Sequence, residues 1–161
     1  EFERCAEKNR TDTPQKRSEK MLSYNVLVVD DDKGIRDLLE GLLEEEGYTV
    51  ATARNGREAL DVLRARAELG PHVILLDLMM PVMDGYTVMN MLAANPELRD
   101  SHAIVVMSAA QRLQEGHFDL ANALLPKPFA IDDVLEMVSQ WTHRITHSGD
   151  KGQPGTQPTT G

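Results

Sequence analysis

The feature that most constrains the fold of this chain is the alternation of two apolar patterns along its middle segment. Short apolar runs, most of them rich in β-branched residues and typical of strands buried on both faces, recur five times. They are Val26–Val29, Tyr48–Ala53, Val73–Leu76, Ile104–Met107 and Ala123–Leu125. The segments between them carry apolar residues three and four positions apart, as on the buried face of a helix. This alternation predicts an α/β fold, a parallel sheet covered by helices on both faces.

The helical spacing is clear in four segments. They are Ile35–Leu43, Ala59–Leu63, Val88–Leu92 and Val134–Ile145. Gly47 follows the first of them and Asn95-Pro96 the third, and both are typical stop signals for a helix. The segment Arg112–Ala121 is the least periodic stretch between two strands, and we expect a short helix there.

The length of the chain, 161 residues, fits one domain with additional segments at its ends. Residues 1–23 have almost no apolar content, and residues 147–161 are rich in Gly, Pro, Thr and Gln. Such segments cannot bury enough surface to order themselves. We therefore expect a single domain over residues 24–146, with a flexible N-terminal arm and a flexible C-terminal tail.

The charge balance argues against two classes of function. The chain carries 17 Lys and Arg against 26 Asp and Glu, a formal net charge of −9. A surface this acidic is repelled by nucleic-acid backbones and by anionic lipid, so we expect neither as a partner. No apolar run approaches the roughly 18 residues that a membrane-spanning helix needs. A cytoplasmic location is the expectation.

Polar side chains follow four of the five predicted strands. They are Asp30-Asp31-Asp32 after the first, Asp77 after the third, Ser108 after the fourth and Lys127 after the fifth. In an open parallel sheet, functional groups gather beside the carboxyl ends of the strands. The sequence therefore predicts one cluster of carboxylates, a hydroxyl and an ammonium group along a single edge of the sheet.

The chemistry of this cluster favours a divalent cation. Asp30, Asp31 and Asp77 would lie close together, and like charges at short range are costly unless a cation neutralises them. Carboxylate oxygens with no His or Cys beside them select Mg²⁺, with Mn²⁺ as the alternative. Asp32 is different, because it directly precedes the first helix. We interpret it as the helix N-cap and not as a metal ligand.

These motifs in this order resemble the receiver domain of bacterial two-component response regulators. The matching pieces are Val28–Asp31, Asp77–Gly85, Ser108-Ala109 and Lys127–Phe129, and the resemblance covers about residues 24–145. Each piece lies at the end of a different predicted strand, so the resemblance rests on several motifs in a fixed order and not on one short motif. The resemblance implies a flavodoxin-like (βα)5 fold, a doubly wound five-stranded parallel sheet with strand order 2-1-3-4-5.

The resemblance also implies a metal site. Asp31, Asp77 and the backbone carbonyl of Met79 would be direct ligands of Mg²⁺, with Asp30 close by or bridged through water. Asp77 would in addition be the nucleophile that forms an aspartyl phosphate.

Two further residues would compensate the charge of the phosphoryl group. Lys127 would neutralise one phosphoryl oxygen, and Ser108 would donate a hydrogen bond to another. The family pattern also implies a cis Lys127-Pro128 peptide bond.

The implied function is that of a signalling switch in a phosphorelay and not that of an enzyme. A sensor histidine kinase or a histidine phosphotransfer protein would supply the phosphoryl group, and slow self-dephosphorylation would return it to water. The output would be a downstream protein partner, or self-association, through the face formed by the fourth helix, the fifth strand and the fifth helix of the family fold.

The sequence departs from the family pattern near the fifth strand. Many receivers have Tyr or Phe three residues before the strand-end lysine, where this chain has Leu124. Ser108 and Lys127 are also only 127 − 108 = 19 positions apart, a short interval for the family. We therefore expect activation to act through the loop after Ser108 and the segment Arg112–Ala121, with little change at the fifth strand.

Two other classes share parts of this pattern. Flavodoxin-like sheets bind FMN at the same edge, but the phosphate of FMN needs a loop of Ser, Thr and Gly, and Asp30-Asp31-Asp32 would repel it. A Mg²⁺-dependent phosphatase with an Asp nucleophile usually has an acid two residues after that nucleophile. Here Met79 stands at that position.

Overall fold

The computed structural model describes residues 25–109 and 118–147. The arm expected at 1–23 and the tail expected at 147–161 lie outside these residues, apart from His147, which ends the last helix. None of the described helices is long and apolar enough to cross a membrane.

Five parallel strands form one sheet in the order β2-β1-β3-β4-β5. They are β1 (Asn25–Val29), β2 (Thr49–Ala53), β3 (His72–Asp77), β4 (Ala103–Ser108) and β5 (Ala123–Pro126). Each predicted strand is present, and the strand order is the one that the resemblance implied. The order reverses between β1 and β3, which places the carboxyl ends of these two strands side by side at the switch point.

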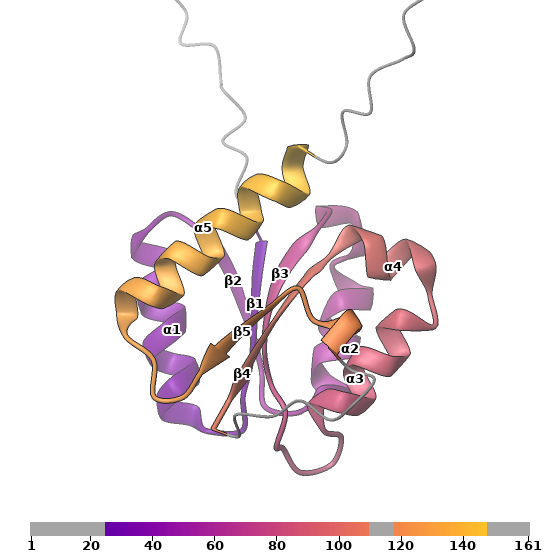
Figure 1. Ribbon diagram of the computed structural model, residues 1–161, viewed down its shortest axis with the longest axis horizontal. Helices are drawn as coiled ribbons and strands as arrows, with labels where there is room; N and C mark the ends of the chain where they lie inside the picture. The colour runs from indigo at the N-terminus through magenta and orange to yellow at the C-terminus, as the bar shows by residue number, and fades with distance from the viewer. Residues whose placement is uncertain (1–24, 110–117, 148–161) are drawn as a thin grey trace, which may run out of the picture.

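The described helices cover both faces of the sheet (Figure 1). They are α1 (Lys33–Glu45), α2 (Gly56–Ala65), α3 (Gly85–Ala93), α4 (Pro96–Ser101) and α5 (Ile131–His147), with 3₁₀ turns η1 (Ala67–Leu69) and η2 (Phe118–Leu120). Helices α1 and α5 pack on one face, and α2, α3 and α4 lie on the other.

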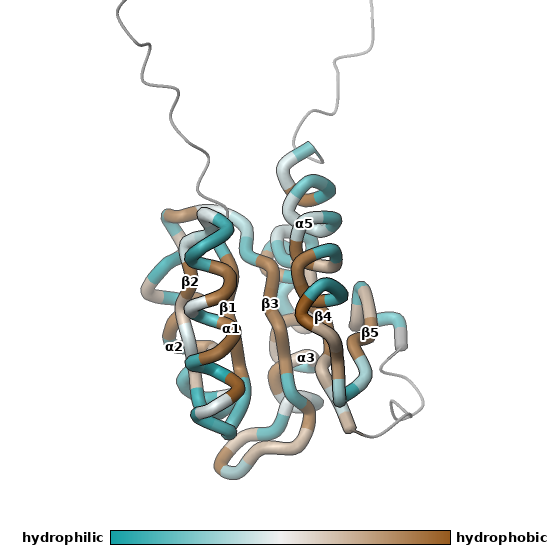
Figure 2. Tube along the Cα trace, turned by 90° about the vertical axis from the view of Figure 1, so that its left-hand side faces the viewer, coloured by the Kyte–Doolittle hydropathy of each residue, from teal (hydrophilic) through white to brown (hydrophobic). Residues whose placement is uncertain are grey.

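The core consists of two layers, because successive side chains of a strand point to opposite faces. In β1, Leu27 and Val29 pack with α2 and α3, whereas Val26 and Val28 pack with α1 and α5. All four side chains are fully buried. Figure 2 shows the same contrast, with brown apolar strands in the centre and teal polar residues on the outer sides of the helices. Burial on both faces explains why these strands read as continuous apolar runs.

Two segments differ from the sequence prediction. A short helix, α4, begins directly after the expected end of α3, because Asn95 caps it through hydrogen bonds from the N–H groups of Glu97 and Leu98. Pro96 occupies its first turn, where a missing N–H costs nothing. Most of the helix expected at Arg112–Ala121 lies outside the described residues. The described end of that segment is the 3₁₀ turn η2, and Ala121 is not helical.

Candidate functional site

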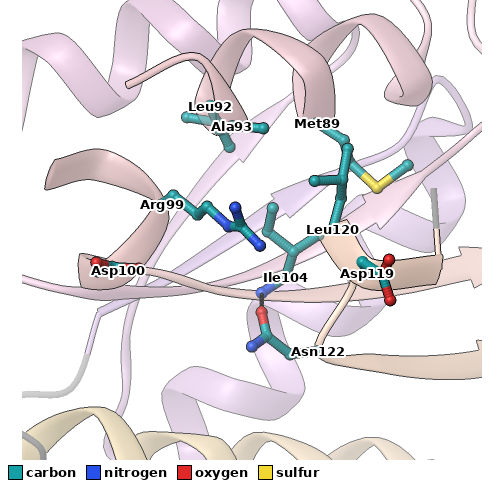
Figure 3. Close-up of a pocket in the computed structure, with 9 residues that line it drawn as sticks. All are labelled: Met89, Leu92, Ala93, Arg99, Asp100, Ile104, Asp119, Leu120 and Asn122. Atoms are coloured by element: carbon teal, nitrogen blue, oxygen red, sulfur yellow. Dashed lines mark hydrogen bonds between the residues drawn. The ribbon is translucent and has the colours of Figure 1, made fainter. Parts of the chain in front are cut away.

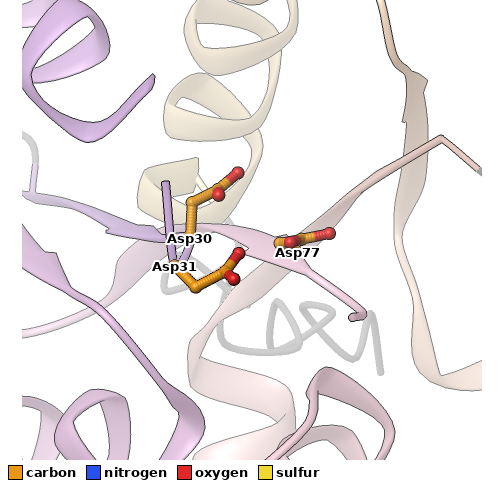
Figure 4. A group of neighbouring side chains, drawn as sticks. All are labelled: Asp30, Asp31 and Asp77. Carbon is orange, nitrogen blue, oxygen red and sulfur yellow. The ribbon is translucent and has the colours of Figure 1, made fainter. Parts of the chain in front are cut away.

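Three carboxylates meet at the carboxyl edge of the sheet. Asp30 and Asp31 directly follow β1, and Asp77 is the last residue of β3. Because Val29 is in register with Leu76, the two strands bring these residues to the same level. One oxygen from each carboxylate lies within 4.8 Å of the others, and Figure 4 shows the three side chains near one another at this edge. The predicted acidic cluster is therefore present in the structure.

Lys127 lies against two of these carboxylates. Its Nζ is 2.6 Å from Oδ2 of Asp30 and 3.7 Å from Oδ2 of Asp77. The lysine follows β5, and its backbone N–H donates to the carbonyl of Ser108 at 2.9 Å, which fixes its height on the sheet edge. The Lys127-Pro128 peptide bond is cis, as predicted. Asp30 is fully buried, so this contact supplies the counter-charge that a buried carboxylate requires.

Asp77 is buried at the end of its strand, and its surroundings disfavour the charged form. Burial raises the pKa of its carboxyl group, and the neighbouring carboxylates of Asp30 and Asp31 raise it further. Lys127 and the backbone N–H of Met79 act in the opposite direction. A second cation at this edge would relieve the repulsion among the carboxylates. The donor set thus fits a hard divalent cation.

Ser108 and Met79 also lie at this edge. Asp77 is in register with Met107, so Ser108 lies one residue beyond it on the neighbouring strand, and it is buried. Met79 is two residues after Asp77 and donates its N–H to Asp77 Oδ1 at 3.5 Å. Its side chain is largely exposed. All the residues that the sequence predicted for the site are thus brought to one edge of the sheet.

Asp32 lies outside the cluster and caps helix α1. Its Oδ1 accepts hydrogen bonds from the N–H groups of Gly34 at 2.7 Å and Ile35 at 3.2 Å. Its own backbone N–H donates to Asp30 Oδ1 at 2.9 Å. The predicted N-cap role is confirmed, and the cap links the start of α1 to the acidic cluster.

Gly85 is part of the frame of the site. A Cβ atom at this position would lie 2.4 Å from the carbonyl oxygen of Asp77, and the Gly85 N–H donates to the carbonyl of Leu78 at 3.0 Å. Helix α3 can therefore approach the end of β3 only with glycine here. The preceding residue, Asp84, is the N-cap of α3. The close approach under Asp77 had no sequence signal.

A separate cavity of about 580 Å³ lies between α3, α4, Ile104 of β4 and the residues before β5. Figure 3 shows Arg99 reaching toward it and Asn122 bonded to Ile104. The amide Oδ1 of Asn122 accepts from the N–H of Ile104 at 2.7 Å. No residue of the acidic cluster lines this cavity. The cavity is thus not part of the candidate site.

Leu124, at the position where many receivers have Tyr or Phe, lies on the outer strand of the sheet. Leu124, in β5, is 45% exposed, and β5 forms the edge beyond β4. Its side chain lies beside a cavity of about 340 Å³ between β5 and α5. The apolar side chain is therefore about half exposed at the edge of the sheet.

Comparisons with known proteins agree with this geometry. Residues 26–139 match the family model of the response regulator receiver domain. The chain belongs to this family. As a receiver domain of two-component systems, it carries the acidic cluster and the strand-end lysine at the positions described above.

Similar curated proteins are response regulators. The response regulator MprA of Mycolicibacterium vanbaalenii is 36% identical over 135 residues, covering 82% of this chain and 56% of that protein. MprA of Mycobacterium ulcerans is 38% identical over 133 residues, covering 81% and 55%. The chain thus spans about half the length of the curated relatives it matches.

Solved structures of receivers are similar as well. A CheY-like receiver domain protein from Methanospirillum hungatei gives a TM-score of 0.68 at 26% identity, covering 78% of this chain and 98% of that one. The response regulator TrrA of Thermotoga maritima, solved in complex with Mg²⁺-BeF, gives 0.63 at 31% identity, covering 73% and 98%. The flavodoxin-like fold is therefore established.

Proposed function

We propose that this receiver domain accepts a phosphoryl group on Asp77 in a Mg²⁺-dependent reaction and thereby switches a protein-interaction surface. The observation that carries the proposal is the convergence of three carboxylates within 4.8 Å, with Lys127 Nζ in contact with two of them. A carboxylate crowded by two others and faced by an ammonium group is suited to bind a divalent cation and to react with a phosphoryl donor.

The metal would be held by residues of this edge alone. Asp31 and Asp77 would supply carboxylate oxygens, and Asp30 lies close enough to contribute directly or through water. By resemblance to other receivers, the backbone carbonyl of Met79 would be a further ligand. Mn²⁺ suits the same oxygen donors. When bound, Mg²⁺ neutralises charge that develops on the transferred phosphoryl group. The TrrA structure with Mg²⁺-BeF supports this assignment by relationship.

The transfer step uses an oxygen of Asp77 as the nucleophile. A bond forms between Asp77 Oδ and phosphorus while the bond from phosphorus to the histidine nitrogen of the donor breaks, and that nitrogen keeps the electron pair and takes up a proton. Lys127 and Ser108 stabilise the charge on the phosphoryl oxygens. Water later attacks phosphorus, releasing inorganic phosphate and restoring the Asp77 carboxylate. We propose a switch with this weak self-dephosphorylation, not an enzyme that turns over a substrate.

The partners follow from this chemistry. The donor is the phosphohistidine of a sensor kinase or of a histidine phosphotransfer protein. The output surface comprises β5, α5 and the segment between β4 and β5, and it binds a downstream protein or a second copy of the chain. The half-exposed Leu124 and the groove between β5 and α5 give this surface an apolar centre, with Asp133 and Glu136 along its side.

Labelling with acetyl phosphate tests the proposal without a partner protein. In the presence of Mg²⁺, the wild type should gain the mass of one phosphate, in a base-labile linkage. Asp77→Asn should gain none, because the nucleophilic oxygen is lost, and chelation of Mg²⁺ should abolish the gain in the wild type. Asp32→Asn is the matched control, because Asp32 is an acidic neighbour that caps a helix. It should be labelled like the wild type.

The same experiment separates the other classes. Labelling of Asp77→Asn at the wild-type level would contradict the nucleophile assignment. Rapid catalytic consumption of acetyl phosphate would indicate a phosphatase, and absorbance in the flavin band of the purified protein would indicate a flavodoxin-like function. Amide exchange with and without beryllofluoride then tests the output: protection should change mainly in residues 108–121 and little in 123–126.

A further inference from the structure

Arg36 contacts the backbone beneath the acidic cluster. Its Nη1 donates to the carbonyl of Asp30 at 2.7 Å and to the carbonyl of Asp31 at 3.0 Å. One guanidinium nitrogen therefore holds both peptide units that follow β1. The direction of each acidic side chain depends on these units, because a side chain leaves the backbone at a fixed angle.

The position of Arg36 in its helix needs such an explanation. It lies one turn after the N-cap of α1, at the positive end of the helix dipole, where a cation is unfavourable. Lys33, in the same region, pairs with Asp37. Arg36 has the two carbonyls of the acidic turn as its hydrogen-bond acceptors.

The two acidic residues differ in what else holds them. The Asp30 carboxylate accepts hydrogen bonds from Lys127 Nζ and from the N–H of Asp32. The Asp31 side chain is exposed, and within residues 25–109 and 118–147 no hydrogen bond to its carboxylate is present. Its orientation thus rests on its backbone, and the carbonyl of that backbone is held by Arg36.

We infer that Arg36 is a positioning residue for the divalent cation, acting through the peptide units of Asp30 and Asp31. This inference rests on the proposed function, because it concerns the same metal site. Its effect is to keep the Asp31 carboxylate directed toward Asp77 before the cation arrives. Pre-orientation of this kind lowers the free-energy cost of ordering the ligand side chains when the cation binds.

Charge and position predict opposite effects on metal affinity. Arg36 is a cation near a cation site, so loss of its charge alone would strengthen metal binding. Loss of its hydrogen bonds would weaken binding, because Asp31 would no longer be held. The sign of the change therefore distinguishes the two roles.

Titration with Mn²⁺, followed by the electron paramagnetic resonance of the free ion, measures the affinity directly. Arg36→Gln should bind Mn²⁺ about tenfold more weakly than the wild type, at the low end of the range for groups that orient metal ligands. Lys33→Gln is the matched control, because it removes one positive charge from the same helix end without touching the carbonyls. It should bind Mn²⁺ as tightly as the wild type or slightly more tightly. Arg36→Lys keeps the charge and should recover part of the loss.

Acetyl phosphate labelling provides a second measurement. For Arg36→Gln, the Mg²⁺ concentration that gives half of the maximal rate should rise, whereas the rate at saturating Mg²⁺ should stay near that of the wild type. A variant that merely unfolds would lose the rate at every Mg²⁺ concentration, and thermal unfolding without metal checks this directly.

The outcomes separate the proposed function from the positioning role of Arg36. If the wild type binds no Mn²⁺ and takes up no phosphate, the proposed function itself fails. If the wild type does both, and Arg36→Gln binds Mn²⁺ as tightly as Lys33→Gln, the positioning role of Arg36 is wrong.

Discussion

The two ends of the parallel sheet both bury polar side chains, but they do so in opposite ways. At the carboxyl end, Asp30 and Asp77 are buried and held against the ammonium group of Lys127. At the amino end, His72 and His102 are buried beside each other, with ring centroids 5.5 Å apart. One end concentrates charge, and the other excludes it.

The partners of the histidines explain the difference. His102 Nδ1 accepts a hydrogen bond from the backbone N–H of His72 at 3.0 Å, and His72 Nδ1 lies 2.9 Å from the carbonyl of Gly70. Burial lowers the pKa of both rings, that of His102 to about 4, so both are neutral at pH 7. Neutral polar side chains can accept or donate the hydrogen bonds that strand ends leave open. Crowded carboxylates instead repel one another and favour the binding of a cation. The amino end therefore contributes to stability, whereas the carboxyl end is where we propose that the chemistry takes place.

The largest expected effect comes from a change in the frame of the carboxyl end. Gly85→Ala places a Cβ 2.4 Å from the carbonyl oxygen of Asp77, so α3 or the end of β3 must shift. We expect a loss of about 3 kcal/mol in the free energy of unfolding, at the upper end for overpacking because the contact is to backbone. Urea denaturation measures this loss.

The control for this substitution is Gly41→Ala. Gly41 lies inside α1, and no atom lies within 4 Å of a Cβ added there. The change should stabilise the protein by about 1 kcal/mol, because alanine favours the helix. A loss for Gly41→Ala of the same size as for Gly85→Ala would contradict the close-approach argument.

A pH titration tests the amino end. His102 has an ordinary pKa of 6.5 when unfolded and about 4 when folded, so the unfolded state binds the proton more tightly. Stability is complete above pH 6.5 and falls as the pH is lowered toward 4, by roughly 3 kcal/mol from this group. His102→Gln removes the titrating group. The stability gap between the two proteins should therefore narrow between pH 7 and pH 4.5, as followed by chemical denaturation at each pH. A constant gap over this range would show that His102 does not carry the effect.

Replacing a buried charged residue at the carboxyl end with a neutral one should increase stability, whereas loss of His102 at the amino end decreases it. Asp77→Asn removes a carboxylate whose pKa is raised by burial and by Asp30 and Asp31. In metal-free buffer at pH 7, we expect the variant to be more stable than the wild type, because the buried carboxylate and its repulsion by Asp30 and Asp31 are removed. Added Mg²⁺ should raise the melting temperature of the wild type and leave that of the variant nearly unchanged. A less stable variant in metal-free buffer would mean that the cluster stabilises the fold.

The sequence predicted most of the sheet because its strands are buried on both faces. Leu27 and Val29 on one side, and Val26 and Val28 on the other, have no polar neighbour to interrupt the run. The site residues were predictable for a related reason, since a polar residue directly after such a run must lie at the sheet edge. Asp30 and Asp77 follow this rule directly. Lys127 does not, because Pro126 separates it from the run Ala123–Leu125 and only Leu125 of β5 is buried.

The remaining features depend on contacts between distant segments. The capping Asn95 and Pro96 gave a local signal for α4, but they also fit a simple end of α3. The contact between Gly85 and the Asp77 carbonyl and the contact of Arg36 with two backbone carbonyls follow from how α3 and α1 pack. A glycine or an arginine in a sequence does not by itself indicate that it will contact the backbone of a distant segment. Single-sequence patterns predict which residues reach an edge, but not which backbone groups support them there.

The smallest expected effect concerns backbone strain, which also differs between the two ends. At the amino end, positive φ angles fall on Gly47 and Gly70, which adopt them without cost. At the carboxyl end, the loop between β3 and α3 places Val82 at φ 70°, the only described non-glycine residue with a positive φ. The N–H of Met83 donates to the carbonyl of Pro81 at 2.8 Å, which closes a tight turn around it.

Replacing this residue with glycine should relieve the strain without removing any packing. The Val82 side chain is 84% exposed, so little buried surface is lost. A β-branched residue in the left-handed region costs about 1–2 kcal/mol, and the greater freedom of glycine in the unfolded chain offsets part of the gain. We therefore expect Val82→Gly to stabilise the protein by about 0.5 kcal/mol, measured by urea denaturation. Val82→Ala is the control, since it shortens the side chain but keeps the steric cost of a Cβ, and it should gain less than glycine. A Val82→Gly variant clearly less stable than Val82→Ala would show that the loop bears no strain at this residue, because only the entropic cost of glycine would then remain. The two ends of the sheet would then differ in charge alone.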